Sequence, residues 1–447
     1  AYNLRLQGFA VIIFEAQEKL GGMLRFGIPD YRLPKDVLDT EINDLLRHGI
    51  QAETGMRFGQ DITLDELGRQ GYSSVLVTIG LQGGTPLNVP GNEAEGVVDA
   101  IQFLRALNFG IRTDLQGRAV IVGGGNVAID AARAAKRLGC PEVTVAYRRT
   151  ENEMPAFAEE IEGARQEGIQ FMELAAPVEV LAQGGKVTGL SCIKCELGMP
   201  DSSGRPRPVP IKGSEFVLDC DVVIPAIGQK LDAPWISDQP DLAVTGQGLF
   251  HVSAQMQTTL PQVFTAGDVV RGPATVIHSI ADGHTAAGAV ARFAKGQPVA
   301  PVLTIARTEG EAEYSWKAVP SGICETAPRQ EASYMAADER STCFLEECQG
   351  LSEDKGVKEA ERCLNCGCSC MQSCPFDVIQ FDGKAGVSHK CTLCSDLIQV
   401  GQKPICVDVC LTDALKFGEH ELLKQNALDL GKTVIQELSQ AGHIYVR

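Results

Sequence analysis

The chain has 447 residues, of which 44% are hydrophobic, and its formal charge at pH 7 is −17. This length predicts about two to four domains, and the apolar content is ample for a core. No apolar run approaches the ~18 residues of a membrane-spanning helix, which excludes a predicted span. No basic stripe is present either, which argues against a nucleic-acid-binding protein.

The first fifteen residues have the pattern of a helix end followed by a strand. Ala1–Leu6 is typical of a helix end, Gly8 stops it, and Ala10–Phe14 is a strand that leads to Glu15. This is the second half of a β-α-β nucleotide-binding unit, whose first strand and glycine turn we expect before residue 1. An acidic residue at this strand end binds an adenosine ribose in such units. Glu15 is therefore a candidate ribose ligand, with a surface glutamate as the alternative.

A complete β-α-β unit occupies Ala119–Arg149. The apolar run Ala119–Val122 predicts a buried parallel strand, the Ala-rich Val127–Leu138 a helix, and Val143–Tyr147 a second strand. Glycines after the first strand permit a tight turn and close approach of the backbone to a pyrophosphate, which the helix N-terminus also favours. The alternative is a tight turn without a ligand. The predicted phosphate-binding turn consists of Gly123, Gly124, Gly125 and Asn126.

The end of the second strand predicts which nucleotide is bound. An NAD site has an acidic residue there, for the ribose 2′-hydroxyl. This chain has Arg148 and Arg149. Two guanidinium groups bind a 2′-phosphate through forked, charge-assisted hydrogen bonds, so the pair favours NADP(H). Two solvated arginines at a strand end are the alternative.

Six stretches carry further motifs, among them two strand-to-glycine crossovers and a β-hairpin. They are Phe14–Pro34, Val75–Gly80, Glu153–Ala156, Gly198–Gly213, Val222–Gly228 and Val263–Ala287. Together they resemble the small, flavin-bearing subunit of glutamate synthase and its relatives. The resemblance covers 1–300 and implies an α/β fold with two Rossmann-like domains. An FAD domain, 1–111 and 229–300, would be split around an NAD(P)H domain, 112–228, and its N-terminal strand and glycine motif would be missing from the chain.

The same resemblance implies which residues bind FAD. Asp268 would bind the ribityl and pyrophosphate region, and the helix after Gly272–Pro273 would begin near the isoalloxazine ring. A helix N-terminus in that place stabilises negative charge on a reduced flavin. No acid–base residue is needed. The implied cofactor-binding residues outside the β-α-β unit are Glu15, Gly21, Gly22, Leu24, Arg25, Gly27, Ile28, Thr78, Gly80, Ile227, Gly228, Gly267, Asp268, Ala274, Thr275 and Val276.

The α/β rhythm stops beyond residue 300. The stretch 301–350 is dominated by Pro, Glu and small residues, which predicts a linker that wraps other parts. Leu351–Arg362 predicts a helix that leads into a cysteine-rich domain at 351–418. The amphipathic pattern of Leu422–Leu438 predicts that the tail, 419–447, is helical and docks on or covers another element.

Nine of the sixteen cysteines lie between Cys363 and Cys410. Clustering at one end of a long chain indicates metal ligation in a reducing compartment, not a secreted disulfide scaffold. Two half-repeats with Cys-x-x-Cys pairs resemble bacterial two-cluster ferredoxins, in which the last cysteine of each run ligates the other cluster. The resemblance implies a small α+β ferredoxin-like domain with two [4Fe-4S] clusters. One would be held by Cys363, Cys366, Cys370 and Cys410, and the other by Cys391, Cys394, Cys406 and Cys374.

Some cysteine assignments leave alternatives open. The first run is one residue longer than usual, so Cys368 is an alternative ligand to Cys370. Zinc is the alternative metal, since paired Cys-x-x-Cys motifs also bind it. Cys192 and Cys195 lie in an alternating strand pattern with no second pair nearby, so we interpret them as ordinary strand residues.

Taken together, these patterns predict an electron-transfer flavoprotein, an NAD(P)H-dependent FAD and iron–sulfur oxidoreductase. A flavin is required between a nicotinamide, which moves two electrons together, and clusters that move one. No terminal active site is recognisable, so we expect a cytoplasmic complex with other iron–sulfur subunits of glutamate synthase, hydrogenase or formate dehydrogenase type. The alternatives are a flavin-based electron-bifurcating subunit, and a non-catalytic wiring subunit whose nucleotide domains are structural.

Overall fold

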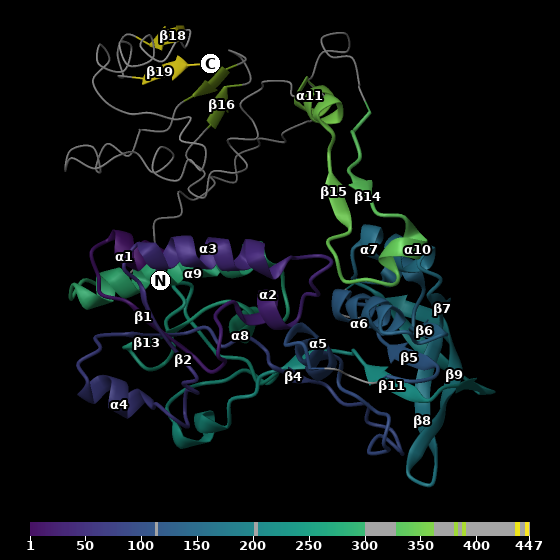
Figure 1. Cartoon of the computed structure of the whole chain (residues 1–447). Helices are drawn as coiled ribbons and strands as arrows, with labels where there is room; N and C mark the ends of the chain where they lie inside the picture. Colours follow the sequence, from purple (N-terminus) through teal and green to yellow (C-terminus); the bar gives the residue numbers. More distant parts are fainter. Residues whose placement is uncertain are drawn as a thin grey trace. The chain divides into compact units, whose positions relative to one another are not determined.

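The computed structural model describes residues 1–111, 115–200, 204–299 and 328–361, together with four short strands nearer the C-terminus (Figure 1). The chain forms two compact units. The first comprises Ala1–Tyr314 and Ala332–Ser352, and the second comprises Ser315–Glu331 and Glu353–Arg447. No helix within the described ranges is long and apolar enough to cross a membrane.

An inner strand, β5 (Ala119–Val122), is buried on both faces and organises the first unit. It belongs to a parallel sheet in the order β11–β5–β6–β7, formed with β11 (Val222–Pro225), β6 (Val143–Ala146) and β7 (Gln170–Met172). Ala119 and Ile121 belong to a core shared with the helices α5 (Ala100–Asn108), α6 (Asn126–Arg137) and α7 (Ala158–Gln166). Val120 and Val122 belong to a second core, as expected for alternate residues of a strand. The predicted strand–helix–strand unit is confirmed.

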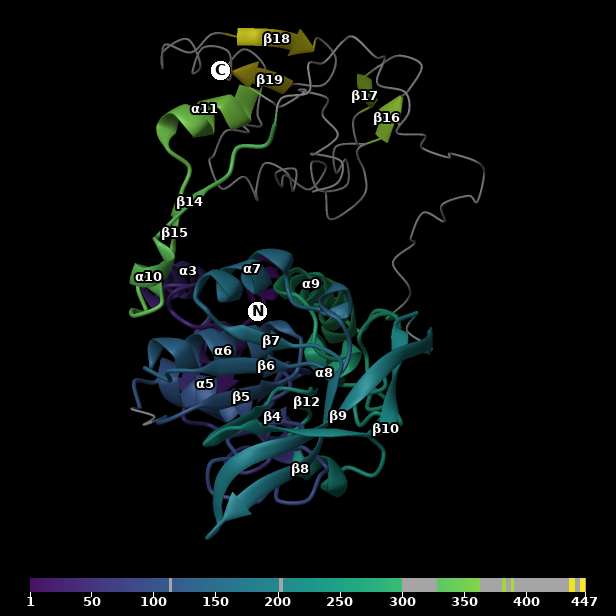
Figure 2. The same ribbon diagram turned by 90° about the vertical axis from the view of Figure 1, so that its right-hand side faces the viewer.

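A three-stranded antiparallel sheet closes the second core, and Figure 2 shows its long strands in teal. Its strands are β8 (Ala175–Gln183), β9 (Lys186–Pro200) and β10 (Pro206–Asp219). Gly184 and Gly185 join β8 to β9 with φ values of 61° and 84°, the positive values that a two-residue hairpin turn requires. The hairpin predicted at Gly198–Gly213 is confirmed and extends beyond both bounds.

Two parallel strand pairs form the remaining part of the first unit. β1 (Ile12–Glu15) pairs with β2 (Gln51–Thr54), and β3 (Val75–Val77) pairs with β13 (Val263–Thr265). The pair β3–β13 joins stretches that precede and follow the sheet of β5 in the sequence. The short strands β4 (Gly83–Gly84) and β12 (Gln229–Lys230) do the same. The helices here are α1 (Tyr2–Leu6), α2 (Gly22–Phe26), α3 (Lys35–Arg47), α4 (Leu64–Arg69), α8 (Asp268–Arg271) and α9 (Val276–Ala294).

The C-terminal unit contains helix α11 (Glu353–Glu361), which confirms the helix expected from residue 351, and two antiparallel strand pairs. The pairs are β16 (Gln380–Asp382) with β17 (Val387–His389), and β18 (Val434–Leu438) with β19 (His443–Val446). The prediction that the tail, 419–447, is helical is therefore wrong for the residues of β18 and β19. β-Branched and aromatic side chains in these two runs favour extended pairing over a helix. Residues 419–433, 439–442 and 447 of that prediction lie outside the described residues.

The predicted linker is also corrected in part. Residues 301–327 lie outside the described residues, but Ala332–Ser352 belongs to the first compact unit. We call Ala332–Ser352 the strap. It contains β14 (Ser333–Tyr334), α10 (Ala337–Arg340) and β15 (Cys348–Gly350), with β14 and β15 antiparallel. Sequence patterns missed this fold because the strap packs on distant helices.

Buried charges fill the space between α6, α7 and the strap. Arg133 Nη2 lies 2.5 Å from Glu167 Oε1, and Arg137 Nη1 lies 2.5 Å from Glu167 Oε2. Glu347 of the strap accepts from both arginines. The side chains of Arg137 and Glu167 are 0% exposed. We call Arg133, Arg137, Glu167 and Glu347 the charge cluster.

A loop of the N-terminal domain reaches the same helices. Tyr31 is fully buried, and the Arg137 guanidinium carbon lies 3.8 Å from its ring centroid. Arg32 Nη1 donates to both carboxylate oxygens of Asp130 at 2.8 and 2.9 Å, and its Nε lies 2.9 Å from Glu160 Oε1. The loop therefore joins the two domains of the first unit through a buried ring and a forked ion pair.

Burial raises the pKa of Asp130 to about 6, although Arg32 opposes the shift. The folded protein then binds a proton here that the unfolded chain releases, so stability falls as pH rises from about 4 to about 6. Between pH 5 and pH 7 we expect wild type to lose about 1 kcal/mol of unfolding free energy relative to Asp130→Asn.

Urea unfolding of both proteins at the two pH values measures this difference. The control is Asp36→Asn, which removes an exposed carboxylate on α3 and should keep the pH dependence of wild type. Equal pH dependence in wild type and Asp130→Asn would contradict the prediction.

Candidate functional site

The glycine turn between β5 and α6 owes its shape to backbone crowding. Gly123 has φ of 145°, and a Cβ there would collide with the carbonyl oxygen of Ala226. A Cβ on Gly124 would lie 2.7 Å from the Tyr147 ring. Gly125 has an ordinary φ of −91°, and its nearest neighbour would be Pro155 at 3.9 Å. The first two glycines are required by the fold, whereas Gly125 leaves space for a ligand.

The start of α6 suits an anion. Gly125 is its N-cap residue and has no side chain to bond the first N–H groups of the helix. Such a terminus attracts phosphate through these groups and the helix dipole. The Asn126 side chain has another partner, because its Oδ1 accepts from the Phe157 N–H at 3.0 Å. The Ala156 N–H donates to the Gly124 carbonyl at 3.1 Å, so the segment before α7 buttresses the turn.

The two arginines after β6 differ in exposure. Arg148 is exposed at the strand end. Arg149 is 3% exposed, and its Nε donates to the Pro206 carbonyl of β10 at 2.7 Å. The structure thus brings both near the turn's strand end, as predicted, but only Arg148 presents its side chain to solvent.

The predicted flavin-lining segment turns sharply at two glycines. Gly21 and Gly22 have φ values of 127° and 51°, which favour glycine. Leu24, Gly27 and Ile28 follow in or directly after α2. Arg25 is buried rather than free to line a ligand: its Nε donates to the Leu20 carbonyl at 2.5 Å and it pairs with Asp39.

Other predicted ligands lie at strand ends. Glu15 ends β1, accepts from the Gln17 N–H at 2.9 Å, and has its pKa raised by burial. Thr78 and Gly80 follow β3, with Gly80 at φ of 64°. Ile227 and Gly228 follow β11, and the Gly228 carbonyl accepts from the Thr85 N–H at 3.0 Å.

The loop before α9 is held by a residue that the sequence patterns did not single out. Asp282 is 2% exposed and accepts from the Gly267 N–H at 3.2 Å and from Arg271 Nε at 2.7 Å. Asp268 accepts in turn from the Ala274 N–H at 3.3 Å, and burial raises the pKa of Asp268. A lone Asp within an Ala-rich helix was the available signal.

The first residues of α9 are open to a flat ligand. Thr275 is the N-cap residue and makes no side-chain cap, because its Oγ1 lies 2.8 Å from His278 Nδ1. Val276 is 45% and Ile277 72% exposed. An exposed apolar start to a long helix fits a ring that carries negative charge when reduced.

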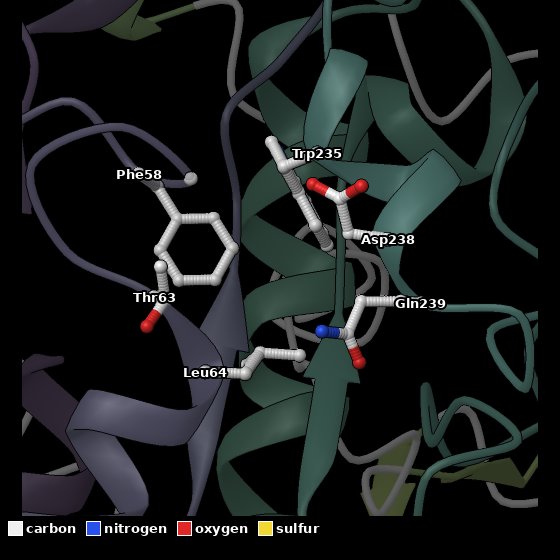
Figure 3. A pocket seen from close by; sticks show the side chains of 7 residues that line it. Phe58, Thr63, Leu64, Trp235, Asp238 and Gln239 are labelled. Atoms are coloured by element: carbon white, nitrogen blue, oxygen red, sulfur yellow. The ribbon is translucent and has the colours of Figure 1, made fainter.

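A small cavity elsewhere is excluded as the cofactor site. Phe58, Trp235, Leu64 and Asp238 are among its lining residues in Figure 3, and its volume is about 40 Å³. That volume accommodates water but no nucleotide. A Cβ on Gly59 would strike Trp235, so the Gly59 backbone lies directly against this ring at the cavity wall.

All eight predicted cluster ligands lie outside the described residues. Within the described ranges, no group of three or more His, Cys, Asp or Glu side chains could hold a metal ion. Cys192 and Cys195 are free and buried in β9, which agrees with their interpretation as strand residues.

Fold and site together define an oxidoreductase built from two nucleotide-binding domains. The chain belongs to the pyridine nucleotide-disulphide oxidoreductase family, whose model matches residues 15–283. A 4Fe-4S dicluster domain model matches residues 339–420.

The chain is also similar to curated oxidoreductase subunits. The chain is 38% identical to the NADP(+)-dependent formate dehydrogenase subunit beta of Moorella thermoacetica over 82% of this chain, and spans about half of that protein, 52%. It is 33% identical to the glutamate synthase [NADPH] small chain of Azospirillum brasilense, covering 68% of this chain and 66% of that one. The resemblance seen in the sequence is confirmed.

A solved structure supports the fold alone. A mutant of FprA from Mycobacterium tuberculosis superposes with a TM-score of 0.57 at 18% identity, covering 66% of this chain and 82% of that one. The α/β class and the paired Rossmann-like domains are thereby confirmed.

The glycine turn allows a matched test. Gly123→Ala should lower the unfolding free energy by about 1–3 kcal/mol, because the backbone is strained and a carbonyl blocks the methyl group. Gly125→Ala should change it by less than about 0.5 kcal/mol yet weaken nucleotide binding at least tenfold. Urea unfolding and fluorescence titration with NADP(H) measure the two effects. Undiminished binding by Gly125→Ala would show that the turn is not the phosphate site.

Proposed function

We propose that this chain is an electron-transfer subunit that moves electrons between NADP(H), FAD and two [4Fe-4S] clusters. The observation that carries the proposal is an open glycine turn with an exposed Arg148 beside it, in a chain whose C-terminal part matches a dicluster domain. When bound, the flavin exchanges a hydride with the nicotinamide and single electrons with the clusters.

The residues present fit NADP(H). Gly125 and the uncapped start of α6 would hold the pyrophosphate, because space and N–H donors meet there. Arg148 would bind the 2′-phosphate from solvent. Arg149 would act behind it, since the Pro206 carbonyl fixes its guanidinium.

The residues also fit FAD. Glu15 would hold the adenosine ribose, the positive-φ glycines Gly21 and Gly22 would admit the backbone to the ring, and Asp268 would bind the ribityl and pyrophosphate region. The start of α9 would face the ring and stabilise its reduced form. Arg25 would support this site from behind through Leu20 and Asp39.

Eight of the nine clustered cysteines would hold the two clusters, with Cys368 as the spare thiol. The dicluster match supports clusters over zinc. The described cysteines are all free, which suits a cytoplasmic, reducing compartment. Relatives named as beta or small subunits support assembly with further redox subunits.

Arg148→Ala should raise the KM for NADPH at least tenfold and leave the KM for NADH within twofold, because only NADPH carries the 2′-phosphate. Steady-state reduction of ferricyanide, an artificial acceptor, measures both. Lys186→Ala, which removes an exposed cation from the same domain, is the control. A parallel change in both KM values would contradict the assignment.

Cys391→Ser should remove one cluster and leave flavin reduction by NADPH within twofold of wild type, because the ligand lies outside the nucleotide-binding domains. Iron analysis and stopped-flow absorbance measure the two properties. Cys192→Ser is the control and should keep all its iron. Full iron content in Cys391→Ser would show that the ligand assignment is wrong.

A further inference from the structure

The strap is fastened to the nucleotide-binding domains although residues 300–331 separate it from them in sequence. Its α10 contacts α7, where Arg340 Nη2 donates to Gln166 Oε1 at 2.7 Å (Figure 1). Arg340 Nε also lies 3.2 Å from Glu167 Oε1. The Cys343 carbonyl accepts from Arg137 Nε at 3.0 Å. Polar contacts therefore hold the strap along its length.

Glu347 is the centre of this attachment. Its N–H donates to the Tyr31 carbonyl at 3.1 Å, and its carbonyl accepts from the Met335 N–H at 2.9 Å. Its carboxylate pairs with Arg133 and lies 3.3 Å from Arg137 Nη2. One residue thus bonds the N-terminal loop, the start of the strap and helix α6.

The Glu347 contact is buried, so its charged groups need partners of opposite charge. Glu347 is 5% exposed and Arg133 1%. With a neutral side chain at 347, Glu160 and Glu167 remain as carboxylate partners, but one buried counter-charge is lost to the two arginines. Water satisfies them if the strap lifts away. Loss of the carboxylate should therefore weaken the attachment of the strap to α6.

The place of the strap in the chain suggests what it serves. It ends at Ser352, and α11 begins at Glu353. The first predicted cluster ligand, Cys363, follows about a dozen residues later. With the strap fastened, the tether from the nucleotide domains to Cys363 is those dozen residues. With it released, the connection runs from Val299 to Gln330, whose N–H donates to Glu359 Oε2 of α11 at 2.8 Å. That path is about three times longer, which lowers the effective concentration about fivefold.

We propose that the strap is a docking element that holds the cluster-bearing part of the chain to the nucleotide-binding domains. Its attachment depends on the ion pairs of Glu347. Its binding site is the face of α6 and α7 that carries Arg133, Arg137 and Glu167. The docking follows from these contacts alone, whereas its effect on electron transfer rests on the proposed function.

Hydrogen exchange on the full-length, cofactor-loaded protein tests the docking. In Glu347→Gln, amides of the strap should exchange at least tenfold faster than in wild type. The control Glu346→Gln removes the neighbouring exposed carboxylate and should leave exchange within twofold. Equal protection in Glu347→Gln and Glu346→Gln would overturn the proposal.

Stopped-flow reduction by NADPH tests the consequence. Flavin reduction in Glu347→Gln should stay within twofold of wild type, while cluster reduction should slow about fivefold. Leu190→Ala, a core truncation in β9, is chosen to lose similar thermal stability and should keep the wild-type cluster rate. Released strap amides with an unchanged cluster rate would overturn the tethering role.

Two further outcomes are distinguishable. Wild type whose clusters are never reduced by NADPH would overturn the proposed function and the tethering role together, and the exchange result would still decide the docking. If Glu347→Gln does not fold, Glu347→Asp keeps the charge but shortens the reach by one methylene. The strap amides of Glu347→Asp should exchange at a rate between those of wild type and a released strap. Wild-type protection of these amides would contradict the role of Glu347 in docking.

Discussion

The first unit depends on helix α6, whose two ends carry different electrostatic constraints. Its N-terminus has uncapped N–H groups, and its C-terminal half carries buried arginines that need carboxylate partners. Its N-terminus leaves N–H groups without a side-chain cap beside Gly125, which suits a phosphate. Its other half carries Arg133 and Arg137, buried against Glu167 at 2.5 Å. Desolvating such charges is costly unless each has a partner, so the second end must be fully paired. The pairing anchors the helix whose first turn would meet the ligand.

The sequence was informative wherever a pattern is local. The continuous apolar run Ala119–Val122 and the glycines after it predicted the parallel strand and turn, because burial on both faces requires an unbroken apolar run. It could not say that Arg149 would bond Pro206 or that Asn126 would bond Phe157, since both partners lie more than a turn away in the chain. Nothing in the sequence alone distinguishes the exposed Arg148 from the buried Arg149.

Longer separations hid still more. Arg133 and Glu347 are 214 positions apart, and no spacing rule links them. The strap has little core of its own, so its composition predicted a linker, and only tertiary contact orders it. Asp282 was missed for a related reason: its role depends on Gly267 and Arg271, which a helical pattern does not reveal. The helical prediction for the tail failed for a different reason. The apolar residues of Val434–Leu438 fit the spacing of a helix as well as that of a strand, and pairing with β19 favours the strand.

The charges around the strap are balanced in a way that explains why it is separable. Asp130, Glu160, Glu167 and Glu347 face four guanidinium groups, those of Arg32, Arg133, Arg137 and Arg340. Lifting the whole strap removes Arg340 and Glu347, one charge of each sign, and the remaining charges stay balanced.

Neutralising Glu347 alone breaks that balance inside a buried site. An apolar contact of equal size in place of these ion pairs would hold the strap as tightly, since buried ion pairs gain little over packed hydrophobic residues. It would, however, expose an apolar patch whenever the strap left, and such patches promote association. An ionic contact leaves a hydratable surface instead, which suits an element that joins two modules.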